Sequence, residues 1–317
     1  MSEDAHAAGA RFSRIDSFGI VVGAYLVALV AALWTLAWCD PAHPFWSVAM
    51  ADLVATLVIF AFSMKLDNGS MYDAYWSVAP PFFVAFWIGQ TAHASALRQA
   101  LVAALVLAWA IRLTWNWARN WPGLHHEDWR YADLYAQAPM PKWLISLLGI
   151  HVFPTIQVFL GGLALAPALA FGRAPVGFLD GIALLVTGGA ILLETIADEQ
   201  MREFARTKET GAIMDRGLWA WSRHPNYLGE LGFWWGLWLF GVAADASWWW
   251  TIVGPAAMTA MFFGASIPML DKRSVARRPG YAEHMQRVPA LLPRRLRLRP
   301  GQTPERRSQP PRSNRCR

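Results

Sequence analysis

Residues 19–38 read GIVVGAYLVALVAALWTLAW, a strongly apolar run without a charged side chain. About twenty such residues are what a helix needs to cross the hydrocarbon core of a bilayer. The rest of the chain follows the same pattern, because 55% of its 317 residues are hydrophobic and only 16% are charged. This composition excludes an ordinary soluble globule and an intrinsically disordered chain. The sequence therefore predicts an all-α, polytopic integral membrane protein.

Further apolar runs of roughly spanning length follow the first one. They cover residues 46–64, 75–90, 97–115, 143–167, 177–197, 226–243 and 248–268. Pro80 and Pro81 interrupt the run at 75–90, so seven spans stay possible beside eight. The 19 tryptophans fit helix ends that lie in two membrane interfaces. We expect a bundle of 7–8 transmembrane helices.

The distribution of basic residues predicts the orientation of this bundle. If both termini are cytoplasmic, every Lys and Arg except Arg98 and Arg173 falls on the inner side. Cytoplasmic loops carry such an excess of basic residues. We expect a protein of the bacterial inner membrane. Its parts would be a cytoplasmic leader at 1–18, a transmembrane domain at 19–293 and a disordered basic tail at 294–317.

The tail and the cysteines exclude some classes of partner. The tail carries no aromatic residue that would stack on bases, so we expect it to attract the anionic inner leaflet rather than nucleic acid. Cys39 and Cys316 lie near opposite ends of the chain and form neither a disulfide framework nor a zinc site. The expected partners are the lipid bilayer and a lipophilic small molecule, and the oligomeric state is not determined.

The sharpest polar motif is WSRHPNYLGE at residues 221–230, directly before an apolar run. Pro225 suits the first turn of a helix, so a helix is expected to begin here at the membrane surface. The free N–H groups of a helix start, with Arg223 and His224 beside them, suit a phosphate or pyrophosphate. Asn226 and Glu230 share one helix face. We predict a cofactor or substrate site; the alternative is an ordinary helix start with Glu230 in a buried salt bridge.

A polar stripe leaves the membrane at the inner end of the run at 177–197. Glu194, Asp198, Arg202 and Arg206 recur every four residues and share a helix face. Taken alone, such a stripe is a solvated face with ion pairs between successive turns. Beside an anion-binding helix start, its carboxylates suit ribose hydroxyls and its arginines suit a phosphate.

A third polar segment lies at the inner end of the run at 97–115, where Arg112 and Asn116 share a helix face. It continues into His125-His126-Glu127-Asp128, which invites a metal hypothesis. Adjacent histidines do not face one another on a helix, and the HExxH spacing is absent. We therefore predict a solvated or structural loop here and no metal.

Smaller polar signals lie inside the apolar runs. Asp52 is either a functional residue or the partner of a buried hydrogen bond to a neighbouring helix. His151 and Gln157 are expected to form hydrogen bonds between helices. The phosphate-binding motifs of the common soluble nucleotide folds are absent. A nucleotide would therefore be held by loops and helix ends at the inner membrane face.

Together these segments resemble the steroid 5-alpha-reductase superfamily and, more narrowly, its bacterial DUF1295 branch. The resemblance rests on the motif at 222–230, the helix with Asp198 and Arg202 before it, and Lys272-Arg273, Pro279-Gly280-Tyr281 and Val288–Pro293 after it. Segments 112–131 and 68–80 also resemble that branch. The resemblance covers about residues 50–293, and the cofactor-binding part would be about 110–293.

The resemblance implies an NADPH-dependent reductase that transfers hydride to a conjugated enone C=C of a lipid-like or steroid-like substrate. Carried over by motif, the cofactor contacts are Arg112, Asn116, Asp198, Arg202, Arg223, His224, Asn226, Tyr227, Glu230 and Tyr281. Asn226, Tyr227 and Glu230 would contact the nicotinamide ribose and amide. Asp198 and Arg202 would lie on the adenosine or phosphate side, with Arg223 and His224 facing the pyrophosphate. The catalytic candidates are Tyr227, Glu230, Tyr72 and Asp73.

This chain also departs from the steroid enzymes. Trp109 stands where their catalytic Tyr would fall, so Tyr72, Asp73 and Asp52 are considered as substitutes that would protonate the substrate. The helix at 19–38 is an addition to the expected seven-span core.

Two other classes of function compete with the reductase. Isoprenylcysteine carboxyl methyltransferases, which use S-adenosylmethionine, carry a related Arg-His-Pro-x-Tyr-x-Gly segment, although Gly229-Glu230 favours the reductases. The other class is a transporter or membrane scaffold. The polar groups gather at one membrane face rather than at the midplane, which counts against transport.

Overall fold

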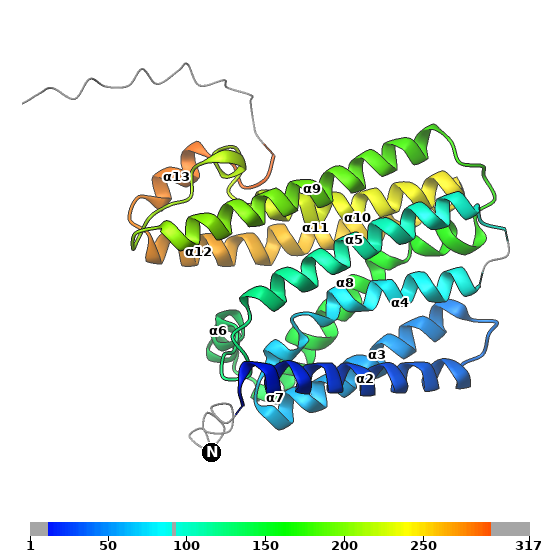
Figure 1. Ribbon diagram of the computed structural model, residues 1–317, viewed down its shortest axis with the longest axis horizontal. Coiled ribbons are helices and arrows are strands. Elements are labelled where there is room, and N and C mark those ends of the chain that lie inside the picture. Colours follow the sequence, from blue (N-terminus) through cyan, green and yellow to red (C-terminus); the bar gives the residue numbers. More distant parts are fainter. Residues whose placement is uncertain (1–11, 91–92, 293–317) are drawn as a thin grey trace, which may run out of the picture.

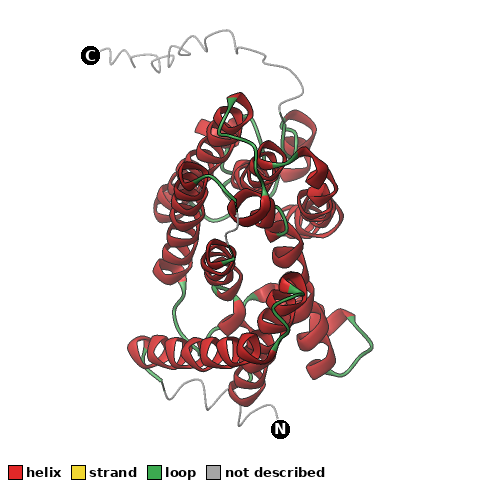
Figure 2. Ribbon diagram, turned by 90° about the vertical axis from the view of Figure 1, so that its right-hand side faces the viewer, coloured by secondary structure: helices red, strands yellow, loops and turns green. Residues whose placement is uncertain are grey.

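The computed structural model describes residues 12–90 and 93–292, and those residues form helices and loops without a strand (Figure 2). The longest helices are α2 (Arg14–Trp38), α3 (Pro44–Leu66), α4 (Tyr75–Gly89), α5 (Ala96–Asn120), α9 (Phe178–Thr207) and α10 (Pro225–Ala244). The shorter ones are α6 (Trp129–Gln137), α7 (Lys142–Ile145), α8 (Phe153–Gly162), α11 (Val253–Met261), α12 (Ile267–Arg277) and α13 (Tyr281–Arg287). The all-α prediction is confirmed for the described residues.

Short segments of 3-10 or π-helix connect several of these helices. The 3-10 turns are Gly69–Tyr72, Gly217–Ala220 and Ala246–Ile252, and the π-helical turns are Ser146–Val152, Pro167–Phe171 and Phe262–Ser266. Through them α7 continues into α8, and α11 continues into α12. Two continuous helical segments result, Lys142–Phe171 and Ala246–Arg277.

Six of the described helical segments are long and apolar enough to cross a membrane: α2, α3, α5, α9, Lys142–Phe171 and Ala246–Arg277. The predicted runs at 75–90 and 226–243 also form helices, α4 and α10, but they are not among the six. α4 has 15 residues, which is about 22 Å of helix against about 30 Å of hydrocarbon. α10 begins with the polar residues Asn226 and Glu230, which make it less apolar.

The helix starts follow local capping chemistry. α2 begins at Arg14, before the predicted run at 19, because Ser13 and Asp16 form a reciprocal capping box. α10 begins at Pro225, as its sequence predicts. Arg14–Phe18 therefore belong to a helix although the sequence placed them in the leader. Residues 1–11 and the predicted tail at 294–317 lie outside the described residues.

The helices lie side by side along the long axis of the molecule (Figure 1). The polar connections at 67–74, 121–141, 208–224 and 278–292 gather at one end, the left end in Figure 1. α9 and α5 end there, whereas α10 and α2 begin there. We call it the polar end of the bundle. It brings together the three segments that the sequence analysis singled out.

α9 and α10 are the most closely packed helix pair around the site. A Cβ added to Gly229 would lie 2.6 Å from the Glu194 Cβ, and one added to Gly236 would lie 2.1 Å from the Thr187 Oγ1. Glycine at these positions removes the side chain that would separate the two backbones, as small residues do between membrane helices. This contact sets Glu194 beside the first turns of α10.

Arg98, one of the two basic residues predicted to lie on the outer side, is fully buried at the opposite end of the bundle. Its Nε donates to Asp180 Oδ1 at 2.6 Å, and its Nη1 donates to the Ala174 carbonyl at 2.9 Å. The guanidinium thus joins the start of α9 to α5. This basic residue is part of the bundle rather than of an exposed loop.

Candidate functional site

Arg112 is the centre of a polar cluster at the polar end of α5, α9 and α10. Its Nη1 donates to Asp198 Oδ2 at 2.9 Å, and its Nη2 lies 2.7 Å from Glu194 Oε1. Asn116, one turn further along α5, donates to the same Asp198 oxygen at 3.0 Å. Asn226, in the first turn of α10, lies within hydrogen-bonding reach of Asp198. Three helices therefore bring five polar side chains together, which we call the Arg112 cluster.

The Arg112 cluster is not saturated by its own members. Arg112 Nε and Glu194 Oε2 are buried and have no hydrogen-bond partner among the described residues. A buried polar atom without a partner costs free energy, so such atoms in a native protein mark a place where a ligand or water completes the bonding. One guanidinium also faces two carboxyl groups, so their oxygens outnumber the donors that Arg112 offers them.

Glu230 lies one turn beyond Asn226 on α10 and is buried. Its Oε2 accepts from the Trp109 indole at 2.9 Å, and its Oε1 accepts from the Trp234 indole at 2.8 Å. Trp109 is stacked on Phe233, with 4.4 Å between ring centroids. The two indole N–H groups take the place of the salt bridge that the sequence analysis considered. Trp109, which stands where a Tyr was expected, thus holds a predicted site residue in position.

Arg223 and His224 form a second cluster, centred on Asp271 of α12. Arg223 donates from Nη2 to Asp271 Oδ2 at 2.7 Å and from Nη1 to the Val288 carbonyl at 2.5 Å. His224 Nε2 lies 3.1 Å from Asp271 Oδ1, and the Tyr281 hydroxyl donates to that oxygen at 3.3 Å. The backbone N–H groups of Arg223 and His224 also bond the carbonyls of Pro289 and Ala290. We call this the Asp271 cluster.

The Asp271 cluster ties three segments together. The chain before α10, the middle of α12 and the segment after α13 meet on one carboxylate and one guanidinium. The Arg223 side chain is only 9% exposed, and its Nε, Nη1 and Nη2 all have partners. In this arrangement Arg223 and His224 bind the protein's own groups rather than facing an open space. Tyr281, a third predicted cofactor contact, belongs to the same cluster.

Tyr227 lies between the two clusters at the start of α10. Its ring stacks on His224 with 5.4 Å between centroids and meets Phe262 edge to face at 4.5 Å. The helix thus places Asn226 toward the Arg112 cluster, while Tyr227 packs beside the Asp271 cluster.

Tyr72 and Asp73 are held by other elements. The Tyr72 hydroxyl lies 2.7 Å from Thr155 Oγ1 on α8 and is buried. Asp73 accepts a hydrogen bond from the Tyr131 hydroxyl on α6. Burial raises the pKa of Asp73 to about 6 although Arg130 acts in the opposite direction. The structure thus places these two catalytic candidates in contact with α8 and α6 rather than with Asp198 or Glu230.

The smaller polar signals have identifiable partners. The Tyr75 hydroxyl donates to Asp52 Oδ1 at 2.9 Å, so Asp52 forms the hydrogen bond to a neighbouring helix that was one of its two interpretations. His151 Nε2 lies 3.1 Å from Ser63 Oγ on α3, which confirms the predicted interhelical bond. Gln157 Oε1 is buried and has no such partner among the described residues.

The stripe on α9 pairs differently from the expectation of ion pairs every four residues. Glu194 and Asp198 bind Arg112 on the neighbouring helix instead of the arginines one turn on. Arg202 pairs with Glu199, which also accepts from Arg119 at 2.8 Å. Arg206 lies 3.9 Å from Glu203 and is exposed. The close packing of α5 against α9 explains the difference, because it brings Arg112 nearer to both carboxylates.

Four residues that take part in these polar contacts were not placed in a site from the sequence: Glu199, Arg119, Trp109 and Trp234. A buried carboxylate in an apolar helix needs donors, and that was the one signal for indoles near Glu230. Nothing in a single sequence could say which tryptophans supply them. Among the described residues no group of three or more His, Cys, Asp or Glu side chains could hold a metal ion.

Fold and site together define a class: a polytopic helical protein that fits a membrane, with two arginine–carboxylate clusters at one end of its bundle. The chain belongs to the family described as "Protein of unknown function (DUF1295)", which matches residues 59–288. It is similar to an uncharacterized protein of Schizosaccharomyces pombe (strain 972 / ATCC 24843), with 27% identity over 280 residues that cover 80% of each chain. No solved structure matches the chain significantly.

Proposed function

We propose that this chain is a membrane-embedded reductase of the steroid 5-alpha-reductase superfamily, which uses NADPH to reduce a conjugated C=C bond of a lipid-like substrate. One observation carries the proposal. α5, α9 and α10 bring Arg112, Asn116, Glu194, Asp198 and Asn226 together at the polar end, and the cluster keeps buried polar atoms without partners.

The donor set of the Arg112 cluster fits the polar half of a nucleotide. Asp198 and Glu194 offer carboxylate oxygens to ribose hydroxyls, and the Asn116 and Asn226 amides can both donate and accept. Arg112 Nε is a free buried donor for an anionic or carbonyl oxygen. NADPH, when bound, supplies the hydride. The protein's own part is to bind, to orient and to exclude water.

Glu230, held between the Trp109 and Trp234 indoles, forms the side of the proposed site that lies deeper among apolar residues. Because Trp109 and Trp234 fix both carboxylate oxygens, Glu230 can accept one more hydrogen bond from a ligand amide without moving. Tyr227 is the phenol nearest to this cluster along the chain and is our first candidate for the proton donor. Tyr72 and Asp73 are the second candidates.

We further propose that the polar end faces the cytoplasm of a bacterial cell. The support is the distribution of Lys and Arg, which favours inner loops at that end. α4 and α10 then complete eight crossings with both termini inside, α4 by local thinning of the bilayer or by burial among its neighbours. Fusion of a reporter to each connection would test this topology.

A ligand titration tests the proposed function. The full chain in detergent is heated with NADPH, NADH or S-adenosylmethionine in parallel, because a ligand that binds the native state raises the melting temperature. We expect selective stabilisation by NADPH. Selective stabilisation by S-adenosylmethionine would instead assign a methyltransferase, and stabilisation by none of them would leave a scaffold or transporter.

The variant Asp198→Asn tests the site itself. Loss of one charged acceptor in a buried cluster should weaken NADPH binding by about tenfold, equivalent to about 1.4 kcal/mol. The matched control is Asp215→Asn, an exposed aspartate in the loop before α10. Equal affinities of both variants would show that the Arg112 cluster is not the nucleotide site.

A further inference from the structure

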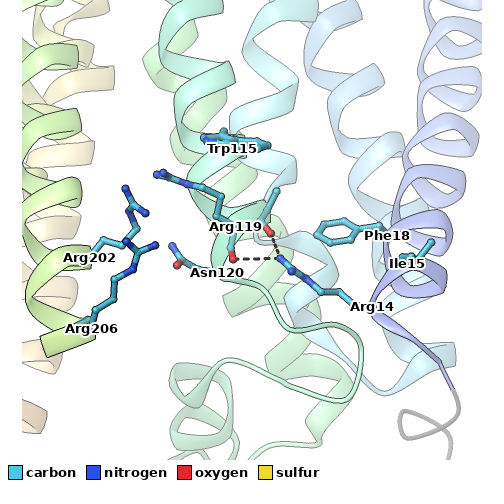
Figure 3. A pocket seen from close by; sticks show the side chains of 10 residues that line it. Arg14, Ile15, Phe18, Trp115, Arg119, Asn120, Arg202 and Arg206 are labelled. Carbon is cyan, nitrogen blue, oxygen red and sulfur yellow. Dashed lines mark hydrogen bonds between the residues drawn. The ribbon is translucent and has the colours of Figure 1, made fainter.

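We propose that a cleft at the polar end, between α2, α5 and α9, binds the phosphate headgroup of an anionic phospholipid. The cleft has a volume of about 740 Å³. Its lining combines arginine side chains with the apolar side chains of Ile15, Phe18 and Trp115. Figure 3 shows arginines from all three helices around the same space.

The charges of the cleft are unbalanced. Arg14, Arg119, Arg202 and Arg206 line it, and no acidic side chain from residues 12–90 or 93–292 does. Glu199 lies beside it and pairs with Arg119 and Arg202, and Glu203 lies 3.9 Å from Arg206. Arg14 has no carboxylate partner in the described part of the chain; its guanidinium donates to the backbone carbonyls of Ala118 and Trp121 at the end of α5. Four arginines thus meet two carboxylates at the cleft, which leaves an excess of positive charge that an anion can balance.

Two of these guanidiniums also have buried donors to spare. Arg119 Nε and Arg202 Nε are buried and have no hydrogen-bond partner within the described part of the chain. A guanidinium donates through its planar N–H groups, and that geometry matches the oxygens of a phosphate. The cleft thus combines excess positive charge with buried N–H donors that have no partner. Ordinary surface arginines lack such buried donors, because water binds their N–H groups.

The apolar part of the lining identifies the anion as a lipid. On α5, the exposed side chains of Leu107, Ile111 and Trp115 follow one another at every fourth residue and lead to Arg119. On α2, Ile15 lines the cleft, and exposed Val22 and Leu26 continue in the same direction along the helix. These two apolar stripes run from the cleft into the membrane-spanning part of the bundle, where acyl chains would lie against them.

The cleft borders the proposed nucleotide site: Arg202, a predicted cofactor contact, lines it, and Arg119 donates to Asn116 at 3.3 Å. α2 begins at Arg14, whereas the family match begins at residue 59. The Arg112 cluster belongs to α5, α9 and α10 and does not line the cleft. A phospholipid here would bridge α2 to α5 and α9, and so hold the additional helix against the rest of the bundle.

The test compares lipids that share their acyl chains. The full chain in neutral detergent is titrated with phosphatidylglycerol, phosphatidylcholine or soluble glycerol 3-phosphate, and binding is followed by native mass spectrometry and by melting temperature. The cleft variant is Arg14→Gln with Arg206→Gln. Its control, Arg277→Gln with Arg287→Gln, removes the same charge from exposed positions elsewhere at the polar end. Because Arg14 also holds the end of α5, Arg206→Gln alone is measured as a milder variant.

We expect phosphatidylglycerol to bind and stabilise the wild type and the control, and to bind the cleft variant at least about tenfold more weakly. Arg206→Gln should show part of this loss at an unchanged melting temperature. If the cleft variant and the control lose lipid affinity equally, the effect comes from general surface charge, and the proposal is overturned. Binding of glycerol 3-phosphate as tight as that of the lipid would assign a free phosphate site instead. Displacement of the lipid by NADPH would assign the cleft to the nucleotide.

Discussion

The two arginine–carboxylate clusters at the polar end use the same chemistry in opposite ways. In the Asp271 cluster, one carboxylate receives Arg223, His224 and Tyr281, and each nitrogen of the guanidinium has a partner. In the Arg112 cluster, one guanidinium faces two carboxylates, and polar atoms remain buried without partners. A saturated cluster holds segments together, whereas an unsaturated one can accept a ligand.

This difference changes which of the two regions is the better candidate for a ligand site. The motif around Arg223 and His224 is the most recognisable one and predicts an anion site. In the structure its side chains join the start of α10 to α12 and to residues 285–290. The helical stripe with Glu194 and Asp198, which read as a solvated face when taken alone, forms the better candidate site.

Arg223→Ala should produce the largest effect on stability. Removal of one partner of a buried ion pair leaves Asp271 without its main counter-charge and costs about 3 to 5 kcal/mol. The measurement is the unfolding midpoint of the full chain in detergent, with exposed Arg287→Ala as the control. If Arg223→Ala melts like the wild type, the Asp271 cluster does not hold these segments together and the comparison fails.

Gly229→Ala should give the next largest effect and act on the other cluster. The new Cβ would lie 2.6 Å from the Glu194 Cβ, so α9 and α10 must separate, at about 1 to 3 kcal/mol. We expect a lower melting temperature together with weaker NADPH binding, because Glu194 is displaced from Arg112. Gly189→Ala, whose Cβ meets nothing within 4 Å, should leave NADPH binding unchanged and should not lower the melting temperature, because alanine favours the helix interior. If Gly229→Ala binds NADPH with full affinity, Glu194 is not part of the nucleotide site.

Asp73 belongs to neither cluster. It shows how burial changes the pKa of a carboxyl group that no arginine binds through two hydrogen bonds. Burial raises its folded-state pKa to about 6, above the value of about 4 for a free carboxyl group. The folded state therefore binds this proton more tightly. The resulting stability is complete below about pH 4 and is lost as the pH rises to about 6, in total about 3 kcal/mol.

Asp73→Asn should remove that part of the pH dependence, because the amide carbonyl can still accept from Tyr131. The difference in unfolding midpoint between wild type and variant, measured from pH 4 to pH 7, isolates the effect from all other carboxylates. Exposed Asp215→Asn is the control. A constant difference over this range would mean that Asp73 titrates like a free carboxyl group.

Much of the fold was accessible to sequence reasoning. The apolar runs placed the helices, Pro225 placed the start of α10, and the polar connections were assigned to one side of the membrane. These features depend on local composition and on neighbours along the chain. The start of α2 was less accurate, because a capping box at Ser13 begins the helix at Arg14, before the apolar run.

Sequence by itself determined which residues lie at the polar end, since hydropathy and helix periodicity assign each to a helix end and a face. Only the tertiary structure decided their partners. Glycine-mediated packing of α9 on α10 and the approach of α5 brought Arg112 to Glu194 and Asp198, and the same packing left Arg223 to Asp271. The physical reason is that a hydrogen bond depends on distances of a few ångströms between helices far apart in the chain. Those distances follow from how all the side chains pack, and no local pattern contains them.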